Sequence, residues 1–264
     1  MVGAPLYEDV GITGYPDIGA VYVFKRTNGI WQQTQRLVAT NPRTNDQFGS
    51  AIAMHGTAAV CGTITDAGGS VQGAAYVFRL SGNTWVLEKK LNASGTTFNF
   101  GSSVAIRDNL ILVGAHNETN GLIAFGGAAY VFEYTGSTWV QRQRLVPSDP
   151  TASDNFGSSV SIEGDMAIIG TPGDDDRGVD AGSIYAFRRV GSVWSQSQKL
   201  SAADTSSGDL FGSSVSQSQG VLIVGAKNKY GPSLYSGAAY AFARQVNSWV
   251  QSARLIVPTT TSSD

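Results

Sequence analysis

Short runs of apolar residues recur along the whole chain, each bounded by glycine, asparagine, aspartate or serine. The runs are rich in β-branched and aromatic residues, which favours strands, and no segment shows sustained helical periodicity. Tight turns such as Glu163-Gly164 and Val190-Gly191-Ser192 separate neighbouring runs and predict antiparallel hairpins. The chain is therefore expected to be all-β. In the best-defined stretch the predicted strands are 158–162, 165–170, 182–189 and 193–200.

The third run of each group is apolar on both faces. Tyr130 and Phe132 share one face, while Gly127, Ala129 and Val131 share the other. A strand buried on both faces needs one sheet in front of it and another behind it. Four-stranded meanders that stack face to face, large residues against small ones, are the blades of a β-propeller.

The fourth run alternates differently. Simple alternation puts one set on one face, Trp194, Gln196, Gln198 and Leu200, and the other set on the opposite face, Ser195, Ser197 and Lys199. This pattern predicts a half-exposed outer strand, whose lysine and arginine residues deter pairing with another sheet edge.

Three sequence anchors, all in register, show that this unit repeats. A glycine followed by a small residue and Tyr-x-Phe occurs five times, as at 127–132, and Phe-Gly-Ser occurs four times, as at 156–158. The period of 54 or 55 residues identifies a repeat architecture. The third anchor is a single tryptophan per repeat: Trp31, Trp85, Trp139, Trp194 and Trp249.

We expect one β-propeller domain over residues 1–264, built from five four-stranded blades. The chain begins inside the second strand of its first repeat, so blade one is expected to lack its first strand. Three arrangements remain open: a closed five-bladed ring, a part of a larger array, or an assembly in which another chain supplies the strand. The approximate repeats are 1–46, 47–99, 100–155, 156–210 and 211–264.

Composition narrows the class of protein. A hydrophobic content of 42% supports a packed core, and a formal net charge of −2 argues against a nucleic-acid partner. No apolar run approaches the roughly 20 residues that span a membrane, and the N-terminus has no signal-peptide pattern. Only 14% of the residues are charged, which fits a secreted or surface protein. Cys61 is the only cysteine, so no intrachain disulfide is expected.

Several segments resemble the FG-GAP repeat family. They are Val2-Gly3-Ala4-Pro5, Phe-Gly-Ser-Ser-Val at 156–160, Ile-Gly-Thr-Pro-Gly-Asp-Asp-Asp at 169–176 and Gly-Ser-Ile-Tyr-Ala-Phe at 182–187. The resemblance covers essentially the whole chain. It implies a β-propeller like those of integrin α heads and some fungal lectins, a secreted or surface location, and binding of proteins or sugars.

The chain departs from the integrin-type pattern at the turn between the first and second strands. Integrin-type members hold Ca²⁺ there in a loop rich in aspartate, but the turns here are two or three residues long, as at Glu163-Gly164-Asp165. A short turn cannot bring enough oxygens around the ion. The chain thus resembles a short-turn variant, and that calcium site is not carried over.

The loops between second and third strands are the most variable part of the repeat, at 5–18, 63–72, 115–126, 171–181 and 226–236. Variable loops on a rigid scaffold commonly carry binding, although solvated loops without a partner are an equally good interpretation. Candidate binding residues are Tyr7, Glu8, Asp9, Asn117, Glu118, Asp174, Asp175, Asp176, Lys227, Lys229 and Tyr230.

Within these loops, Asp174, Asp176 and Asp180 form a candidate Ca²⁺ site, because hard cations take several carboxylate oxygens. Aspartates that form turns with their own backbone are the alternative. The default expectation is that the protein has no cofactor.

No catalytic constellation is evident. His55 and His116 occupy unrelated positions in the repeat, and the Gly-x-Ser-x-Gly elbow is absent. The serines of the Phe-Gly-Ser motifs, such as Ser102, recur in most blades and are interpreted as structural. We expect a non-enzymatic surface or extracellular module that binds a protein or assembles with itself through its loops and open blade edges.

Two alternatives stay open. A lectin would repeat one polar and aromatic set in every blade, and the exposed candidates are Gln33, Gln141, Gln196 and Gln251 beside the tryptophans. A hydrolase or lyase would need a constellation that the sequence does not reveal.

Overall fold

The computed structural model describes residues 1–8, 16–65, 72–95, 98–230, 237–246 and 248–255. These residues form nineteen strands in five antiparallel sheets and no helix. Each sheet is a meander in which consecutive strands pair, so the predicted five blades are confirmed. Blade 1 has three strands, as expected from its missing first strand.

The strands of the five blades have the following bounds. Blade 1 contains β1 (Val2–Ala4), β2 (Ala20–Thr27) and β3 (Ile30–Leu37). Blade 2 contains β4 (Ala51–His55), β5 (Ala58–Thr63), β6 (Ala74–Ser81) and β7 (Thr84–Leu91). Blade 3 contains β8 (Ser103–Arg107), β9 (Leu110–Ala115), β10 (Ala128–Tyr134) and β11 (Trp139–Leu145). Blade 4 contains β12 (Ser159–Glu163), β13 (Met166–Thr171), β14 (Ser183–Val190) and β15 (Val193–Leu200). Blade 5 contains β16 (Phe211–Ser218), β17 (Val221–Ala226), β18 (Ala238–Arg244) and β19 (Trp249–Leu255).

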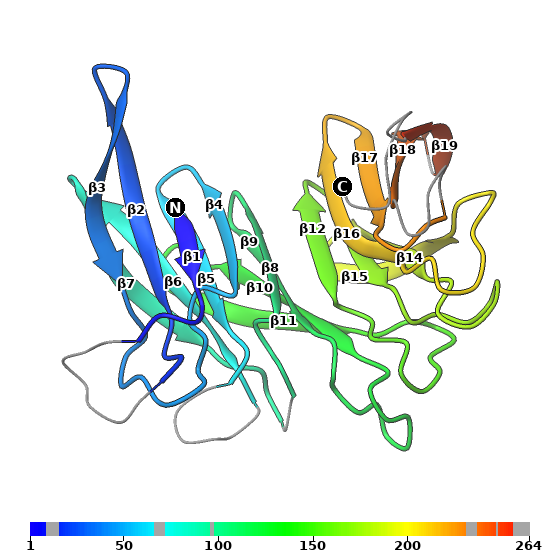
Figure 1. Cartoon of the computed structure of the whole chain (residues 1–264), viewed down its shortest axis with the longest axis horizontal. Helices are drawn as coiled ribbons and strands as arrows, with labels where there is room; N and C mark the ends of the chain where they lie inside the picture. Colours follow the sequence, from blue (N-terminus) through cyan, green and yellow to red (C-terminus); the bar gives the residue numbers. More distant parts are fainter. Residues whose placement is uncertain (9–15, 66–71, 96–97, 231–236, 247, 256–264) are drawn as a thin grey trace.

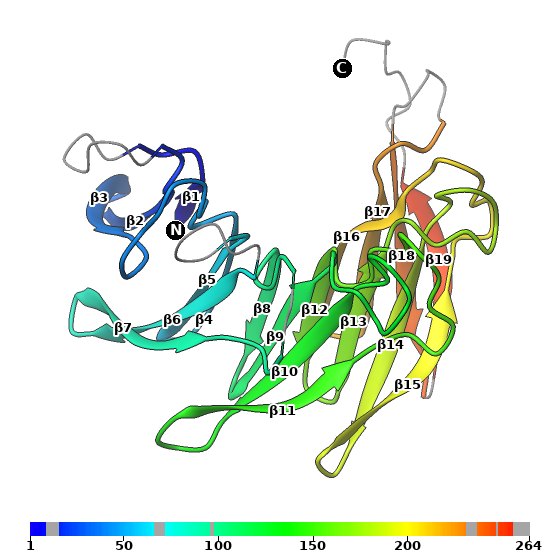
Figure 2. The ribbon, with the colours of Figure 1, turned by 90° about the horizontal axis from the view of Figure 1, so that it is seen from below.

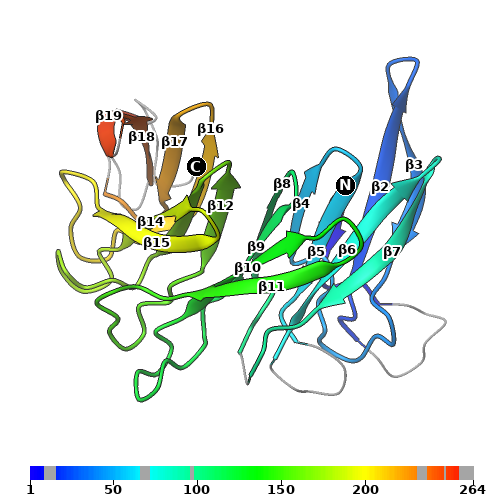
Figure 3. The same ribbon diagram turned by 180° about the vertical axis from the view of Figure 1, so that it is seen from behind.

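The blades follow one another along an open arc (Figure 1). The first strands β4, β8, β12 and β16 are neighbours from blade to blade. Blades 1 and 5 lie apart at the two ends, so the sheets do not close into the five-bladed ring that the sequence left open (Figure 2). Seen from behind, the outer strands β7, β11 and β15 lie on the side facing the viewer (Figure 3).

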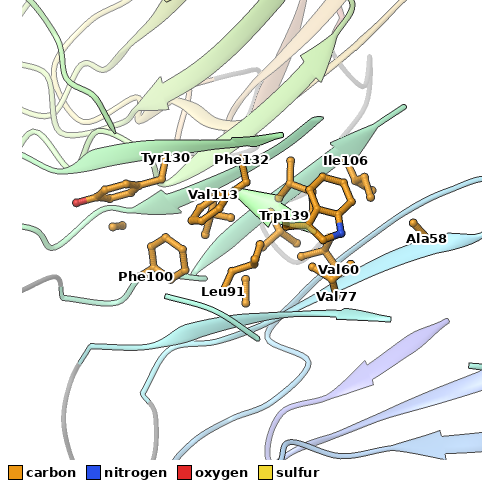
Figure 4. Packing of buried hydrophobic residues seen from close by; sticks show 14 of the residues in the cluster. Ala58, Val60, Val77, Leu91, Phe100, Ile106, Val113, Tyr130, Phe132 and Trp139 are labelled. Atoms are coloured by element: carbon orange, nitrogen blue, oxygen red, sulfur yellow. The ribbon is translucent and has the colours of Figure 1, made fainter. Parts of the chain in front are cut away.

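Each pair of blades is held by large residues that pack on small ones. Between blades 2 and 3, Phe100 and Trp139 lie against Val77 and Leu91 in one cluster (Figure 4). The ring of Phe100 also packs edge-on against Tyr130 of its own blade, with the centroids 5.4 Å apart. Each such side chain contributes about 1.5–3 kcal/mol by burial, so this contact surface is the main source of stability between blades. We call it a joint, and it recurs between all consecutive blades.

Glycines let the backbones of a joint approach closely. Gly127 has φ +77°, and a Cβ placed there would lie 2.0 Å from the carbonyl oxygen of Phe156 in the next blade. The backbone N–H of Phe156 in turn donates to the carbonyl of Gly126, at 3.3 Å. This contact explains why the Phe-Gly motif and the third-strand glycine recur in register.

The fourth strands correct one expectation. Gln196 pairs with Phe187 and Gln198 pairs with Ala186, because a β-bulge leaves Ser197 unpaired. A bulge moves the following residues to the opposite face. Trp194 and Gln196 therefore share one face, but the prediction that Gln198 lies on the same face is wrong. The same register shift occurs in the fourth strands of all five blades.

Candidate functional site

One edge of the arc carries both the loops between second and third strands and the linkers between blades, and we call it the loop edge. Neighbouring loops are tied together there: Asn117 donates from Nδ2 to Oδ1 of Asn99 at 2.7 Å. Asn155 donates to Oδ1 of Asn117 at 3.4 Å. The Asn117 side chain therefore links its own loop to both adjacent linkers.

The predicted binding residue Glu118 is buried in a cluster with Tyr130 and Arg144. The Tyr130 hydroxyl donates to Oε2 of Glu118 at 2.7 Å, and Nε of Arg144 donates to Oε1 at 2.7 Å. Burial, together with the hydrogen bond to Glu118, raises the pKa of Tyr130 above its usual value. Glu118 is only 4% exposed, so in this structure it holds the blade together and does not face solvent.

In blade 4, Asp174 of the acidic loop contacts Tyr185 and Lys199 in the same way as Glu118 contacts Tyr130 and Arg144. The Nζ of Lys199 lies 2.6 Å from the carboxylates of Asp174 and Asp176, and 2.9 Å from that of Asp149. Burial alone would lower the pKa of Lys199, but its hydrogen bonds to these carboxylates raise the pKa above the usual value. Asp174 and Asp176 line a hollow of about 200 Å³ that Lys199 also lines.

This geometry bears on the candidate calcium site. The carboxylates that contact Lys199 are those of Asp149, Asp174 and Asp176. Asp180 has a different contact: its backbone N–H donates to the Asp175 carboxylate at 2.8 Å. Among the described residues, no group of three histidine, cysteine, aspartate or glutamate side chains is arranged to hold a metal ion. A cation at Asp174 and Asp176 would compete with the ammonium of Lys199 for the same oxygens. Ca²⁺ remains a prediction that the present contacts do not favour.

A tyrosine of the third strand faces a cation of the fourth strand in every blade. The directly opposed pairs are Tyr22–Arg36, Tyr76–Lys90, Tyr130–Arg144, Tyr185–Lys199 and Tyr240–Arg254. Sequence reasoning missed this series, although its signal was available: the cations repeat with the period of the tryptophans.

In blades 1 and 5, the cation opposite the third-strand tyrosine contacts residues of a different kind. The Arg36 guanidinium lies 5.1 Å from the ring centroid of Tyr7 and donates to the Tyr7 hydroxyl. In blade 5, Arg254 pairs with Asp204 at 2.8 Å, and the buried Lys229 lies 2.7 Å from Asp209. Tyr7 and Lys229 are therefore held in intramolecular contacts.

The remaining predicted binding residues are either exposed to solvent or outside the described residues. Glu8, Asp175, Asp176, Lys227 and Tyr230 are exposed. Asp9 lies outside the described residues. The structure brings Asp174 and Asp176 together at Lys199, whereas the exposed candidates are spread over the loops of blades 1, 4 and 5. A composite binding face therefore remains a prediction.

The two end faces of the arc differ from the interior joints. On blade 1, Trp31 is 65% exposed, whereas the four other tryptophans are at most 7% exposed. Met1, Val2, Phe24 and Trp31 line an apolar hollow of about 360 Å³. At the other end, Val221, Val250 and Leu255 of blade 5 are exposed. These end faces are the largest departure from the repeat pattern among the described residues.

Comparison with protein-family models finds the FG-GAP repeat at residues 31–78, 85–132, 139–187 and 194–242, most of the chain. The chain belongs to the FG-GAP repeat family. Each matched segment runs from the tryptophan of one blade to the third-strand phenylalanine of the next. The unit that the family model describes therefore spans a joint and not a single blade.

Other comparisons add little to the family assignment. No curated protein matches the chain. The described part of the chain has no helix of the length and apolar character needed to cross a membrane.

The repeated glutamines of the FG-GAP blades have structural partners. Gln141 accepts from the backbone N–H of Ser94 at 2.9 Å and donates to its hydroxyl at 2.8 Å. Gln196 contacts Ser148 in the same way, and Gln251 accepts from the N–H of Ala203. Three of the four glutamines that suggested a sugar pocket are thus used between blades.

A second series of glutamines forms hydrogen bonds with the backbone of the tryptophan in the next blade. Gln143 donates to the Trp194 carbonyl at 2.7 Å and accepts from its N–H at 2.8 Å. Gln35 and Gln198 make the same pair of bonds to Trp85 and Trp249. The bulge makes both sets of contacts possible. It places glutamines such as Gln141 on the face toward the preceding blade, and glutamines such as Gln143 on the face toward the next blade.

One contact was not expected from the sequence. Nδ1 of His116 lies 2.9 Å from Oγ of Ser102, and burial lowers the pKa of His116. No described carboxylate is hydrogen-bonded to His116, so the acid that orients the histidine of a catalytic triad has no counterpart here. Ser102 also occupies the position of Ser213, whose hydroxyl donates to a second-strand carbonyl. The pair is consistent with a structural role.

Proposed function

We propose that this FG-GAP chain is a non-enzymatic interaction module that associates through the exposed end face of blade 1, with a second copy of the chain as the partner that fits best. The observation that carries the proposal is Trp31, which is exposed beside the apolar hollow of Met1, Val2 and Phe24. Exposed apolar patches of this kind mark interaction sites, and tryptophan is enriched among the residues that dominate interface energy.

The choice of partner follows from the joint. In the interior, aromatic residues such as Phe78 and Trp85 pack on the small residues Val21 and Val23 of the preceding blade. Blade 1 exposes the aromatic half of this contact, and blade 5 carries the half with smaller residues, where Ala239 and Ala241 are half-buried and Val221 is exposed. Two copies placed head to tail would join the two halves.

An extracellular or cell-surface location is part of the proposal. The low content of charged residues, 14%, and membership of a family with many secreted or surface members support it. Expression with a secretion signal, followed by measurement of folded protein in the medium, tests whether the chain tolerates export.

The association is tested by light scattering over a range of protein concentrations. We expect a mass that rises above 27.7 kDa with concentration in the unmodified chain, and a monomer for Trp31→Glu. Val193→Glu is the matched control, because Val193 is an exposed apolar residue on a blade 4 hairpin, away from both end faces. A monomer at every concentration, or equal loss of association in both variants, contradicts the proposal.

A hydrolase remains a second candidate only because of the contact between Ser102 and His116. Its test is an esterase assay with short-chain p-nitrophenyl esters. Activity that disappears in both Ser102→Ala and His116→Gln would support catalysis, and activity unchanged by both substitutions would exclude this pair.

A further inference from the structure

We propose that the joint between blades 4 and 5 contains a binding site for a carboxylate group, next to the indole N–H of Trp249. The ligand class is a carboxylate that enters the site by one of its oxygens. The site lies beside the turn between β18 and β19, at the other end of the arc from the apolar hollow of blade 1 (Figure 1). It is therefore independent of the proposed association through Trp31.

The joint between blades 2 and 3 shows how a carboxylate is bound at the equivalent place. Oε2 of Glu88 accepts the indole N–H of Trp139 at 3.3 Å. The Arg79 guanidinium donates to both oxygens of the same carboxylate, each at 3.2 Å. Glu88 is the residue that the β-bulge of β7 leaves unpaired in the ladder. An arginine, an indole N–H and a carboxylate at the bulge thus form one hydrogen-bonded group.

In the joint between blades 4 and 5, a serine replaces the carboxylate of this group. Ser197 is the unpaired bulge residue of β15, so it corresponds to Glu88. Arg188 directly follows the third-strand phenylalanine of blade 4, as Arg79 does in blade 2. The joint therefore keeps the arginine position and lacks the acceptor.

The indole N–H of Trp249 is buried without an acceptor. Trp249 corresponds to Trp139 and is only 3% exposed, yet its Nε1 has no hydrogen-bond partner among the described residues. The Ser197 hydroxyl is bonded elsewhere, to the Ala186 carbonyl at 3.1 Å. Native proteins seldom leave a buried N–H unpaired, because it loses its bond to water and gains nothing in exchange. An acceptor from outside the chain is therefore expected at this point.

The space beside this indole has room for one oxygen atom. Ser197 and Trp249 line a hollow of about 10 Å³, which is the size needed for one atom as large as a water oxygen. Ser197 is exposed, so a ligand can reach the hollow from solvent. One oxygen of a carboxylate fits, while the rest of the ligand stays outside.

Two arginines make the hollow attractive to an anion. Arg188 and Arg244 both line it. Both also pair with Asp165, at 3.3 Å and 2.9 Å, so two guanidinium groups share this one carboxylate. A second carboxylate would add the missing negative charge and accept the indole N–H, as hydrogen bonds with ionised partners are the stronger ones. A water molecule would satisfy the N–H but not the charge, so we infer a carboxylate.

The test observes the indole N–H signals by NMR in protein that carries isotope-labelled tryptophan. The Trp31→Glu background is used, so that association through blade 1 does not interfere. At neutral pH we expect sodium acetate to shift the Trp249 signal downfield until it saturates, and to leave Trp139, already bonded to Glu88, unchanged. No shift of the Trp249 signal would mean that the site holds only water, which overturns the proposal. An equal shift in a matched sodium chloride series overturns the carboxylate class.

Exchanging the bulge residues should move the site from one joint to the other. Ser197→Glu supplies the carboxylate from the chain itself, so the Trp249 signal should shift without acetate and then no longer respond to it. Glu88→Ser makes the reverse change, and the Trp139 signal should become sensitive to acetate. Ser252→Glu is the matched control, because Ser252 is the unpaired bulge residue of blade 5, and Trp249 should still respond. A folded Glu88→Ser protein whose Trp139 signal ignores acetate contradicts the assignment.

Arg244→Gln tests the contribution of charge. Removing this cation should weaken acetate binding by about tenfold or more, the effect of losing a charged hydrogen-bond donor. Arg26→Gln is the matched control, because Arg26 pairs with the fourth-strand tryptophan position of blade 1 as Arg244 does in blade 5. Equal weakening in both variants would show a nonspecific effect of net charge and contradict the site.

A free small carboxylate and an acidic side chain of a partner protein share this chemistry. Acetate is therefore compared with glutamate whose amino and α-carboxyl groups are both blocked as amides. Comparable or tighter binding of the blocked glutamate assigns the site to an acidic side chain. Binding of acetate alone assigns it to a free small carboxylate, and binding of neither compound overturns the proposal.

Discussion

Blades 1 and 5 have the same repeat sequence pattern but present opposite halves of one contact. Blade 1 exposes Phe24 and Trp31, which correspond to the buried Phe78 and Trp85 of blade 2. In blade 5, Gly225 and Gly237 are half-buried. At the equivalent glycines of the other blades, such as Gly62 and Gly73, a Cβ would lie about 2 Å from the backbone of the next blade.

The comparison teaches that a joint is asymmetric. Its aromatic half gains energy from burial and tolerates small changes in position, since dispersion and apolar burial are not directional. Its glycine half depends on close backbone approach and tolerates no added atom. The same substitution should therefore have very different effects at an end face and inside the arc.

The largest contrast is expected for glycine substitutions. Gly127→Ala places a methyl 2.0 Å from the Phe156 carbonyl at positive φ, and should destabilise the protein by about 4 kcal/mol or more. Gly237→Ala has the same unfavourable φ but a clearance of 3.3 Å, so about 1–2 kcal/mol is expected. Urea unfolding followed by far-UV circular dichroism measures both; equal losses would show that the joint is looser than described.

A similar contrast is expected for the tryptophans. Trp139→Ala should cost about 3–5 kcal/mol, because a large buried side chain is removed, whereas Trp31→Ala should change stability by about 0.5 kcal/mol or less. The expectation rests on exposures of 4% and 65%. Thermal unfolding of dilute samples, at which association is negligible, gives both values, and a large loss for Trp31→Ala would mean that its hollow is closed in solution.

The sequence predicted the fold well because the repeat is self-consistent. Short strands, two-residue turns and a doubly apolar third strand leave few alternatives to stacked meanders. The Phe-Gly motif was recognised, but not that its glycine lies against a glycine of the preceding blade. That contact is made between residues some 40 positions apart, and no local pattern reveals it.

The candidate site was harder to predict. Glu118, Asp174 and Lys229 were chosen as polar loop residues, and all three turned out to be buried in ion pairs. Their partners come from fourth strands or linkers that are distant in sequence. The bulge at Ser197 also escaped detection, because simple alternation cannot show where a register shift occurs.

The third contrast concerns the cation opposite the tyrosine. Arg144→Gln removes the partner of the buried Glu118 carboxylate and should cost about 2–3 kcal/mol, less than for a fully buried pair because Arg144 is partly exposed. Arg36→Gln in blade 1 alters contacts with the Tyr7 ring and should cost about 1 kcal/mol or less. The double substitution Arg144→Gln with Glu118→Gln should recover part of the loss; no recovery in urea unfolding would argue against the pair.

The smallest effect concerns Cys61, in the joint between blades 1 and 2. Burial raises the pKa of its thiol to about 12, whereas an exposed thiol ionises near 8.5. The unfolded chain thus loses this proton first, so the thiol's contribution is complete below pH 8 and is lost as the pH rises toward 12. The stability difference between the unmodified chain and Cys61→Ala should fall by about 1.4 kcal/mol per pH unit between pH 9 and 10.5. A constant difference in urea unfolding at pH 7 and pH 10 would mean that the thiol is accessible.

The order of strands within each blade also has a mechanical consequence. Every linker leaves an outer strand and enters the innermost strand of the next sheet, so a pull on the two ends is transmitted through the blades in series. A joint holds its blades by side-chain packing, by scattered backbone and side-chain hydrogen bonds and by single ion pairs such as Arg189–Glu133, whereas the strands within a blade are joined by antiparallel ladders along their length. Under tension we therefore expect blades to part from one another before their strands separate. The chain would then lengthen in discrete steps and behave as an extensible tether.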